Sequence, residues 1–218
     1  MSEEKVGVLK FVNYSKRIVQ IAVGYGWMPG ACYTNIRNVR EFDKLGFLDV
    51  NWKRYDFKAH LEAAKVTRPM LTVAKDIEDI KELPLILEQA YQLLEYAERV
   101  IVVPKDEAFN ESLDEAIPPE FILGYSVPTR YGGTTISTKC FNRPVHLLGG
   151  RPDVQRRLAD KMPVISLDCN RFALDANYGD YFDGDIFRPH PLGGYDTCVH
   201  DSLMNINRIW ENYPLPRC

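Results

Sequence analysis

The sequence predicts an α/β protein, and within that class a compact (β/α)8-type TIM barrel that forms a single domain over residues 1–218. Apolar runs rich in β-branched residues recur along the chain and alternate with helical stretches or loops, a pattern typical of parallel strands joined by helices. A length of 218 residues lies at the lower end for such a barrel. No glycine fingerprint for dinucleotide binding follows the first apolar run, which favours the barrel over a doubly wound sheet.

Seven apolar runs are interpreted as strands of this barrel. Several are apolar throughout rather than alternating with polar residues, as expected of strands that are buried on both faces of a parallel sheet. In chain order the runs are 18–23, 46–50, 70–74, 100–103, 121–125, 145–148 and 164–167.

Four stretches have the spacing of apolar residues that a helix requires. In one of them Leu83, Leu87 and Leu94 fall on a single face, and in another Pro152 stands at a helix start, where proline is favoured. The helices are expected at 57–65, 83–97, 152–159 and 202–213, so the domain should end in a C-terminal helix.

Two connections are long. Residues 104–119 are acidic and are expected to form a surface excursion. Residues 177–194 are rich in glycine, aspartate and proline and are expected to form a loop. A loop of that length inside a compact domain is more often functional than idle.

Composition and charge exclude several classes of protein. A content of 45% hydrophobic and 26% charged residues excludes a disordered, collagen-like or coiled-coil chain. The balance of 27 basic against 30 acidic residues excludes a uniformly basic nucleic-acid binder but leaves room for a local basic groove. No apolar run is long enough to span a membrane, and no signal peptide is expected from the acidic start. Five scattered cysteines without a Cys-x-x-Cys pair indicate reduced thiols, so we expect a cytoplasmic protein with no membrane partner.

Polar residues and glycine turns follow the predicted strands at their carboxyl ends. In α/β barrels this end carries the active site, so these residues should converge on one pocket, with Trp52 as a wall. A single aspartate after a strand is also a common helix N-cap, and for Asp76 capping is the stronger alternative. The residues and turns are Asp49, Asp76, Lys105, 124–126, 149–150 and Asp168.

The string VHLLGGRP at 145–152 is the most specific local pattern. It indicates a buried strand, a turn at Gly149 and Gly150 where the backbone can approach a ligand, and a helix N-terminus suited to an anion. Arg151 would add a guanidinium group there. His146 lies inside the apolar strand, where a histidine is more often a hydrogen-bonded core residue than a base.

Arginines occur in several of the predicted rim loops, among them Arg171 and Arg188, and the string SVPTRYGG occupies 126–133. Arginine beside aromatic rings suits phosphate contacts and base stacking, with a solvated loop as the alternative. Cys198 and His200 lie close together, with His190 or Cys218 as further candidates, but no zinc knuckle is present. We therefore expect no metal, and without a phosphate loop we expect no cofactor.

These strings together resemble the tRNA-guanine transglycosylase superfamily. Their order is a strand ending in Asp49, another ending in Asp76, then FILGYS at 121–126, VHLLGG at 145–150 and SLDC at 166–169. The most similar branch inserts 7-deazaguanines into DNA and is found in phages and bacterial modification clusters, with a similar His-Leu-Leu-Gly turn and Ser-x-Asp segment. The resemblance covers about residues 46–175.

The resemblance implies a role for each matching residue. Asp168 matches the nucleophile that attacks C1′ of the target guanosine, and Asp49 matches the general acid and base on the exchanging base. Asp76 falls where the family recognises the guanine edge, and Gly124 and Tyr125 fall in the turn that lines the base pocket. Other candidate substrate contacts are Ser126, His146, Gly149, Gly150, Arg151 and Arg171.

The implied reaction is a base exchange with retention at the sugar. Guanine leaves, an ester to Asp168 forms, and a 7-deazaguanine attacks the same carbon. The target base has to be flipped out or otherwise exposed to reach the pocket. The implied partners are a nucleic acid, DNA ahead of tRNA, a 7-deazaguanine base such as preQ0, and an accessory protein subunit.

The sequence also departs from the family. Asp49 is followed by Val50-Asn51-Trp52 where the family has Asp-Ser-Gly-Gly-Phe, and the usual Cys-x-Cys-x-x-Cys…His zinc motif is missing. Two alternatives remain open. One is an N-glycosidase or nucleoside hydrolase that uses the same carboxylates with water as the acceptor. The other is a non-catalytic barrel that binds nucleic acid or a partner protein.

Overall fold

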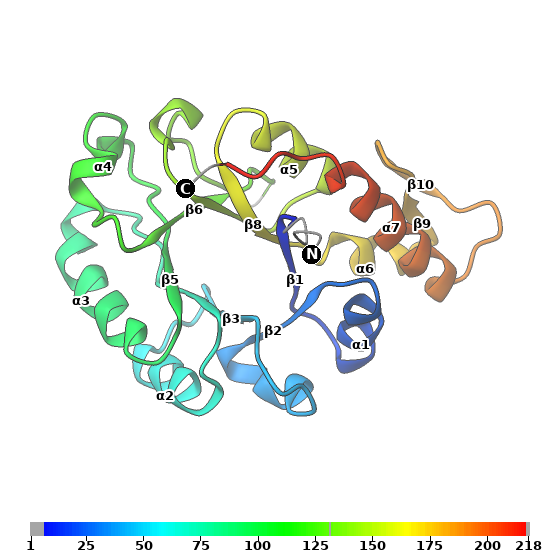
Figure 1. Ribbon diagram of the computed structural model, residues 1–218, viewed down its shortest axis with the longest axis horizontal. Coiled ribbons are helices and arrows are strands. Elements are labelled where there is room, and N and C mark those ends of the chain that lie inside the picture. Colours follow the sequence, from blue (N-terminus) through cyan, green and yellow to red (C-terminus); the bar gives the residue numbers. More distant parts are fainter. Residues whose placement is uncertain (1–6, 131, 217–218) are drawn as a thin grey trace, which may run out of the picture.

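Eight parallel strands close into a barrel in the order of the sequence, and helices cover its outside (Figure 1). The computed structural model describes residues 7–130 and 132–216. Each strand pairs with the next, and the last pairs with the first, so the predicted TIM-type barrel is confirmed. The strands are β1 (Leu9–Val12), β2 (Met28–Cys32), β3 (Phe47–Asp49), β4 (Leu71–Val73), β5 (Arg99–Val102), β6 (Ile122–Ser126), β7 (Val145–Leu148) and β8 (Val164–Asp168).

The helices lie between successive strands and after the last one. The α-helices are α1 (Lys16–Gly24), α2 (Phe57–Thr67), α3 (Leu83–Leu94), α4 (Leu113–Ala116), α5 (Pro152–Ala159), α6 (Arg171–Ala176) and α7 (Tyr195–Trp210). Short 3-10 helices are η1 (Tyr33–Val39), η2 (Ile80–Glu82), η3 (Glu107–Asn110) and η4 (Thr138–Cys140). In the described part of the chain, no helix combines the length and the apolar character needed to cross a membrane.

Most of the predicted elements are confirmed, with one clear error near the start. Six of the predicted strands are β3 to β8, and the four predicted helices are α2, α3, α5 and α7, the last beginning at Tyr195 rather than at 202. Residues 18–23 were expected to form a strand but lie in α1. The buried residues there are Ile18, Val19 and Ala22, which share one face of a helix, whereas a strand would bury alternate residues.

The first two strands, β1 and β2, were not predicted. The sequence of β2 is MPGAC, whose proline and glycine are both depleted in strands. Gly30 is required there, since a Cβ atom at this position would lie 2.9 Å from the carbonyl oxygen of Val12 on β1. The close approach of β1 and β2 therefore explains why β2 contains Gly30, a residue type that argues against a strand.

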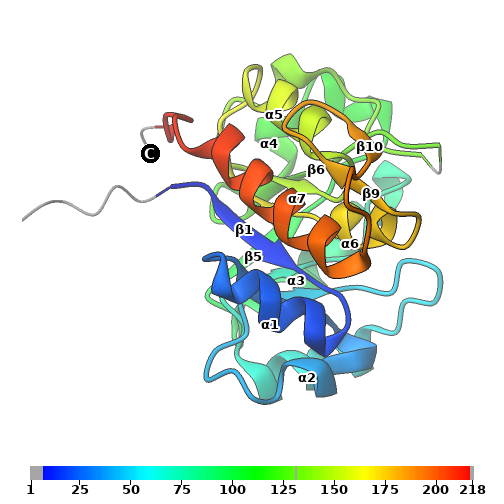
Figure 2. The ribbon, with the colours of Figure 1, turned by 90° about the vertical axis from the view of Figure 1, so that its right-hand side faces the viewer.

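Both long connections contain more structure than expected. The segment 104–119 includes η3 and α4, and its Phe109 and Ile117 are fully buried, so it packs onto the barrel rather than leaving it. The segment 177–194 contains the antiparallel hairpin of β9 (Asp180–Phe182) and β10 (Phe187–Pro189). Figure 2 shows this hairpin against α7 on the outside of the barrel, where the backbone N–H of Phe182 donates to Ser202 at 2.9 Å.

Most of the side chains in the barrel interior are apolar, and the interior is packed rather than a pore. Phe11 and Phe47 lie there with ring centroids 5.7 Å apart. Other buried interior residues are Leu71, Val73, Ile101, Val103 and Ile122. This layer forms a dry floor, so any ligand site has to lie above it, at the mouth of the barrel.

Candidate active site

A pocket of about 360 Å3 opens at the carboxyl ends of the barrel strands. It brings together the three aspartates that end or follow β3, β4 and β8, with Lys105 and the turn after β7. These are the residues that the sequence placed on one rim. The lining residues are Asp49, Val50, Trp52, Asp76, Glu78, Lys105, Ser126, Val127, Thr129, Gly132, Gly133, Leu148, Gly149, Gly150 and Asp168.

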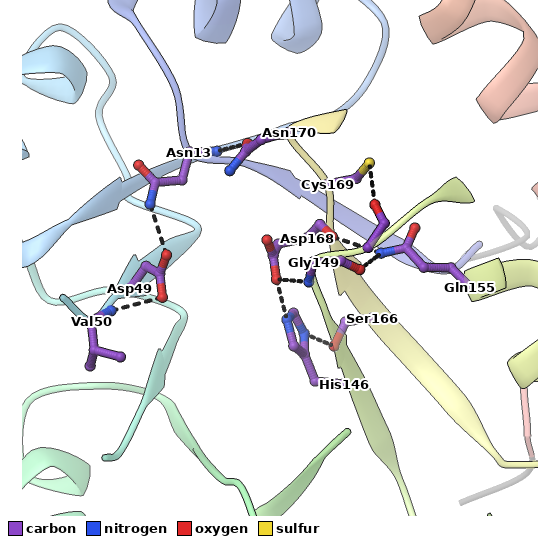
Figure 3. Close-up of polar contacts among 11 residues, drawn as sticks. Asn13, Asp49, Val50, His146, Gly149, Gln155, Ser166, Asp168, Cys169 and Asn170 are labelled. Atoms are coloured by element: carbon purple, nitrogen blue, oxygen red, sulfur yellow. Dashed lines mark hydrogen bonds and ion pairs between the residues drawn. The ribbon is translucent and has the colours of Figure 1, made fainter. Parts of the chain in front are cut away.

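Asp168 is the last residue of β8 and is buried apart from a small part of its side chain. The backbone N–H of Gly149 donates to its Oδ1 at 3.0 Å. Nε2 of His146 lies 3.5 Å from the same oxygen (Figure 3). The described residues supply no hydrogen bond to Oδ2 of Asp168, a residue that lines the pocket.

A buried glutamine holds the turn that faces Asp168. Gln155, on α5, donates through Nε2 to the carbonyl oxygens of Gly149 at 2.7 Å and Asp168 at 2.8 Å. Gly150 has a positive φ of 87°, and a Cβ atom there would lie 2.3 Å from Cγ1 of Val127. The turn is therefore fixed from both sides, and so is the N–H that Gly149 presents to the carboxylate.

Asp49 ends β3 and faces the same pocket from the opposite side (Figure 3). Its Oδ1 accepts from the backbone N–H of Val50 at 2.7 Å, and its Oδ2 accepts from Nδ2 of Asn13 at 2.9 Å. Burial, followed by the negative charge of Asp168, raises the pKa of Asp49 to about 7. These surroundings give the pocket a carboxyl group that can hold a proton near neutral pH beside a second carboxylate.

Asn13 holds Asp49 in place and was not predicted. Its Oδ1 accepts from the backbone N–H of Cys32 at 3.1 Å, and its own backbone N–H donates to Oδ1 of Asn170 at 3.0 Å. It follows β1 directly, so the rule that found the aspartates would have found it if β1 had been recognised. Gln155 carries no such signal, because it lies inside a helix and is far in sequence from its partners.

Asp76 and Lys105 form an ion pair at one side of the pocket. Nζ of Lys105 lies 2.6 Å from Oδ2 of Asp76 and 3.1 Å from Oε1 of Glu78. Burial alone would lower the pKa of Lys105, but the hydrogen bonds and charges of these two acids outweigh it and raise the pKa. The capping alternative for Asp76 is wrong, since Asp79 caps η2 by accepting from the N–H of Lys81 at 2.9 Å. A donor and an acceptor thus stand side by side at the pocket wall.

A model of one protein family matches residues 22–211 of the chain, and its description is "Family of unknown function (DUF6610)". The chain belongs to this family. The residues that the DUF6610 model matches include β2 to β8, and with them all three pocket aspartates. No curated protein matches the chain.

Five of the site residues predicted from the sequence do not line the pocket, although all five lie within the residues that the family model matches. His146 lies beneath Asp168 in the barrel interior, and Gly124 faces the interior, where a Cβ atom would lie 2.6 Å from Cγ2 of Val103. Tyr125 points outward, with its ring centroid 5.1 Å from that of Phe141. Arg151 and Arg171 lie on the outer rim, where they pair with Asp153 at 2.9 Å and Asp175 at 2.6 Å.

The two histidines considered for a metal site have other partners. Nδ1 of His200 lies 2.9 Å from the hydroxyl of Tyr25, and Nε2 of His190 lies 2.9 Å from Oδ2 of Asp201. In residues 7–130 and 132–216, no three histidine, cysteine or acidic side chains are grouped so that they could hold a metal ion. Cys218 and Tyr131 lie outside the described residues.

Trp52 stands at the entrance of the pocket. It is 67% exposed although it is large and apolar, and Nζ of Lys53 lies 5.2 Å from its ring centroid. An exposed indole beside a cation, at the edge of a polar pocket, suits stacking of a flat ligand ring.

Proposed function

We propose that this protein is a glycosyltransferase that exchanges guanine in a nucleic acid for a 7-deazaguanine base through a covalent ester between Asp168 and the sugar. The observation that carries the proposal is the pair of unlike carboxyl groups at one barrel mouth. Asp168 presents an oxygen to the pocket, and Asp49 has a pKa raised to about 7. The choice of guanine, of a 7-deazaguanine and of DNA ahead of tRNA rests on the resemblance to the transglycosylases.

The first half of the reaction breaks the bond between sugar and base. Oδ2 of Asp168 attacks C1′ of the nucleotide and forms a C–O bond, while the C1′–N9 bond breaks and its electron pair leaves with guanine. Asp49 supplies the proton that the departing base needs, which a carboxyl group with a pKa near 7 can do at neutral pH.

The second half returns the enzyme to its starting state. Asp49, now ionised, takes the proton from N9 of the incoming 7-deazaguanine, and N9 attacks C1′. The ester C–O bond breaks and its electron pair returns to Asp168. Two inversions at the same carbon give overall retention, as in retaining glycosidases.

The size of the pocket supports a single nucleotide as the ligand. A volume of about 360 Å3 is near the lower end for ligand sites and is too small for a paired duplex. A base in DNA would therefore have to leave the stack before it could reach Asp168. The exposed ring of Trp52, which lines the pocket, supports stacking against this base or its neighbour as part of the proposal.

Base exchange in vitro tests the proposal directly. The purified protein would be incubated with labelled guanine or preQ0 and, separately, with duplex DNA, single-stranded DNA and bulk tRNA. We expect label to enter one of these polymers and expect Asp168→Asn to abolish the incorporation. Asp160→Asn is the matched control, because Asp160 is exposed and pairs with Arg156 away from the pocket.

Each alternative has its own outcome in this assay. Release of guanine without incorporation of label would indicate a hydrolase that uses the same carboxylates. Neither release nor incorporation, from folded protein and with all three polymers, would overturn the exchange proposal and favour a non-catalytic binding barrel.

A further inference from the structure

A buried histidine and serine lie directly behind the proposed nucleophile. His146 on β7 and Ser166 on β8 are both fully buried, and Nδ1 of the histidine lies 2.8 Å from Oγ of the serine. The other ring nitrogen, Nε2, lies 3.5 Å from Oδ1 of Asp168 (Figure 3). No residue in the described part of the chain completes a hydrogen bond to Nε2. It is therefore a buried polar atom aimed at the carboxylate.

The apolar surroundings of His146 mean that its polar ring lowers the stability of the fold unless both ring nitrogens have partners. Its ring lies in the apolar interior, with centroids 6.0 Å from that of Phe11 and 5.2 Å from that of Phe47. Ser166 satisfies one nitrogen, and Asp168 is the group that the second one faces.

The two partners determine which nitrogen carries the proton. If Nδ1 carried the only proton, the lone pair of Nε2 would face the carboxylate of Asp168, which is repulsive. If Ser166 donates its hydroxyl proton to Nδ1, the ring proton sits on Nε2 and points at Oδ1. A distance of 3.5 Å is longer than the roughly 2.7–3.2 Å of an ordinary N–H···O bond, and such bonds often tighten when substrate binds.

We propose that His146 is a positioning residue that controls how long the sugar stays attached to Asp168. The inference rests on the proposed function, since it concerns the ester of that reaction. The N–H of His146, with that of Gly149, donates to Oδ1, the oxygen that does not attack. When Oδ2 bonds to C1′, Oδ1 becomes the neutral carbonyl oxygen of the ester. When the ester breaks, the returning electron pair restores negative charge to Oδ1.

The direction of the effect follows from this change in charge. A hydrogen bond to a carboxylate is stronger than one to an ester carbonyl, so the donor stabilises free Asp168 more than the ester. Loss of the donor should therefore favour the ester and slow its transfer to the incoming base. Hydrogen bonds to charged groups differ enough from neutral ones to change the ratio of ester to free enzyme by about tenfold.

The position of the ring proton can be measured in the free protein. The chain has four histidines, so ring nitrogen spectra of protein labelled with 15N-histidine can be assigned with single variants. We expect the proton of His146 on Nε2, and we expect its signal to move in Asp168→Asn and Ser166→Ala. A proton on Nδ1 alone, or a signal that Asp168→Asn leaves unchanged, would overturn the positioning role.

Two substitutions test the consequence for the ester. His146→Phe keeps a flat ring beside Phe11 and Phe47 but removes both nitrogens, whereas His146→Gln keeps an amide donor near the position of Nε2. Each variant would be incubated with guanine and with duplex DNA, single-stranded DNA or tRNA, quenched in acid, and weighed by intact mass spectrometry. We expect the fraction of protein bearing a covalent adduct with the base-free sugar of the nucleic acid to rise about tenfold in His146→Phe and to return toward wild type in His146→Gln.

A control variant, a replacement variant and the wild-type result keep these outcomes apart. His60 is the other fully buried histidine, held by Thr72 at 2.8 Å outside the pocket lining, so His60→Phe should lower stability without changing the adduct. If His146→Phe does not fold, Ser166→Ala replaces it and should raise the adduct less. Equal adduct in His146→Phe and wild type would overturn the proposal. A wild-type protein with neither exchange nor adduct would instead overturn the proposed function, while the proton position still decides whether His146 orients Asp168.

Discussion

The two carboxyl groups that face the pocket have unlike surroundings, and our proposal gives them different chemical roles. Asp49 is buried near the negative charge of Asp168, and both effects raise its pKa to about 7. Asp168 accepts a hydrogen bond from the backbone N–H of Gly149, and Nε2 of His146 lies 3.5 Å from the same oxygen. A carboxyl group whose proton affinity is raised by its surroundings is the usual candidate for a general acid.

The raised pKa of Asp49 predicts how the first half-reaction depends on pH. Asp49 carries its proton below about pH 7 and loses it above, so guanine release in a single turnover should be fast on the acid side. Above pH 7 the rate of guanine release should fall, approaching a tenfold decrease for each pH unit. Asp49→Asn cannot donate the proton, so release should drop by about 10²–10⁴-fold and the break near pH 7 should disappear. Rapid-quench measurement between pH 5 and 9 checks this, and an unchanged break in Asp49→Asn would reject Asp49 as the acid.

The buried hydrogen bonds of Gln155 predict a large cost for losing its amide. Gln155→Met keeps similar volume but takes this donor away from the buried carbonyl oxygen of Asp168 and the partly buried one of Gly149. The free energy of unfolding should fall by about 2–4 kcal/mol. Gln20→Met is the matched control, because Gln20 is exposed and should change stability by less than about 0.5 kcal/mol. Equal urea midpoints for the two variants would show that the hydrogen bonds of Gln155 do not stabilise the fold.

The turn between β7 and α5 depends on glycine at position 150. Gly150→Ala would place a Cβ atom against Val127, at a residue with a φ of 87°. The turn has to move, and the N–H of Gly149 moves with it away from Asp168. We expect a loss of about 1–3 kcal/mol in the free energy of unfolding, with reduced guanine release.

A substitution at a second glycine distinguishes the effect of a positive φ from the effect of contact between the new Cβ atom and its neighbours. Gly193 also has a positive φ, of 65°, but a Cβ atom there would meet nothing within 4 Å. Gly193→Ala should therefore cost about 1 kcal/mol and leave guanine release at the wild-type rate. If Gly150→Ala and Gly193→Ala had the same melting temperature and the same rate of guanine release, contact with Val127 would not be what fixes the turn.

Some elements can be predicted from the sequence and others cannot, for physical reasons. Strands β3 to β8 are predictable because burial on both faces makes a short run wholly or mostly apolar. Residues 18–23 are equally apolar, and a run of that length does not distinguish a strand from one face of a helix. Strand β2 was missed because Pro29 and Gly30 hide it.

The candidate site was predictable only in part. Asp49, Asp76 and Asp168 were found because parallel strands deliver whatever follows them to one rim. Asn13 contacts Asp49 from 36 residues away in sequence, across strands whose order had to be known first. His146 was recognised as a core histidine, but its contact with Asp168 depends on the register of β7 and β8, which no local pattern encodes.

At the scale of the whole molecule, closure of the barrel depends on β1. It pairs with β2 on one side and with β8 on the other, and its Phe11 fills the interior. A chain that begins at residue 22, where the family match begins, would lack β1 and leave two strand edges unpaired. We expect it to lose cooperative unfolding, as monitored by circular dichroism in urea. A sharp transition with wild-type amplitude would show that β1 is dispensable for closure.

The order of the strands has a consequence for the protein while it is being made. Asp49 leaves the ribosome more than a hundred residues before Asp168, and Asn13, which orients Asp49, is itself held by Asn170 beyond the last barrel strand. The two carboxylates face each other only when the end of the barrel has returned to its beginning. An unfinished chain therefore holds neither a shaped pocket nor the pair, and the chemistry we propose begins only with a finished ring of strands.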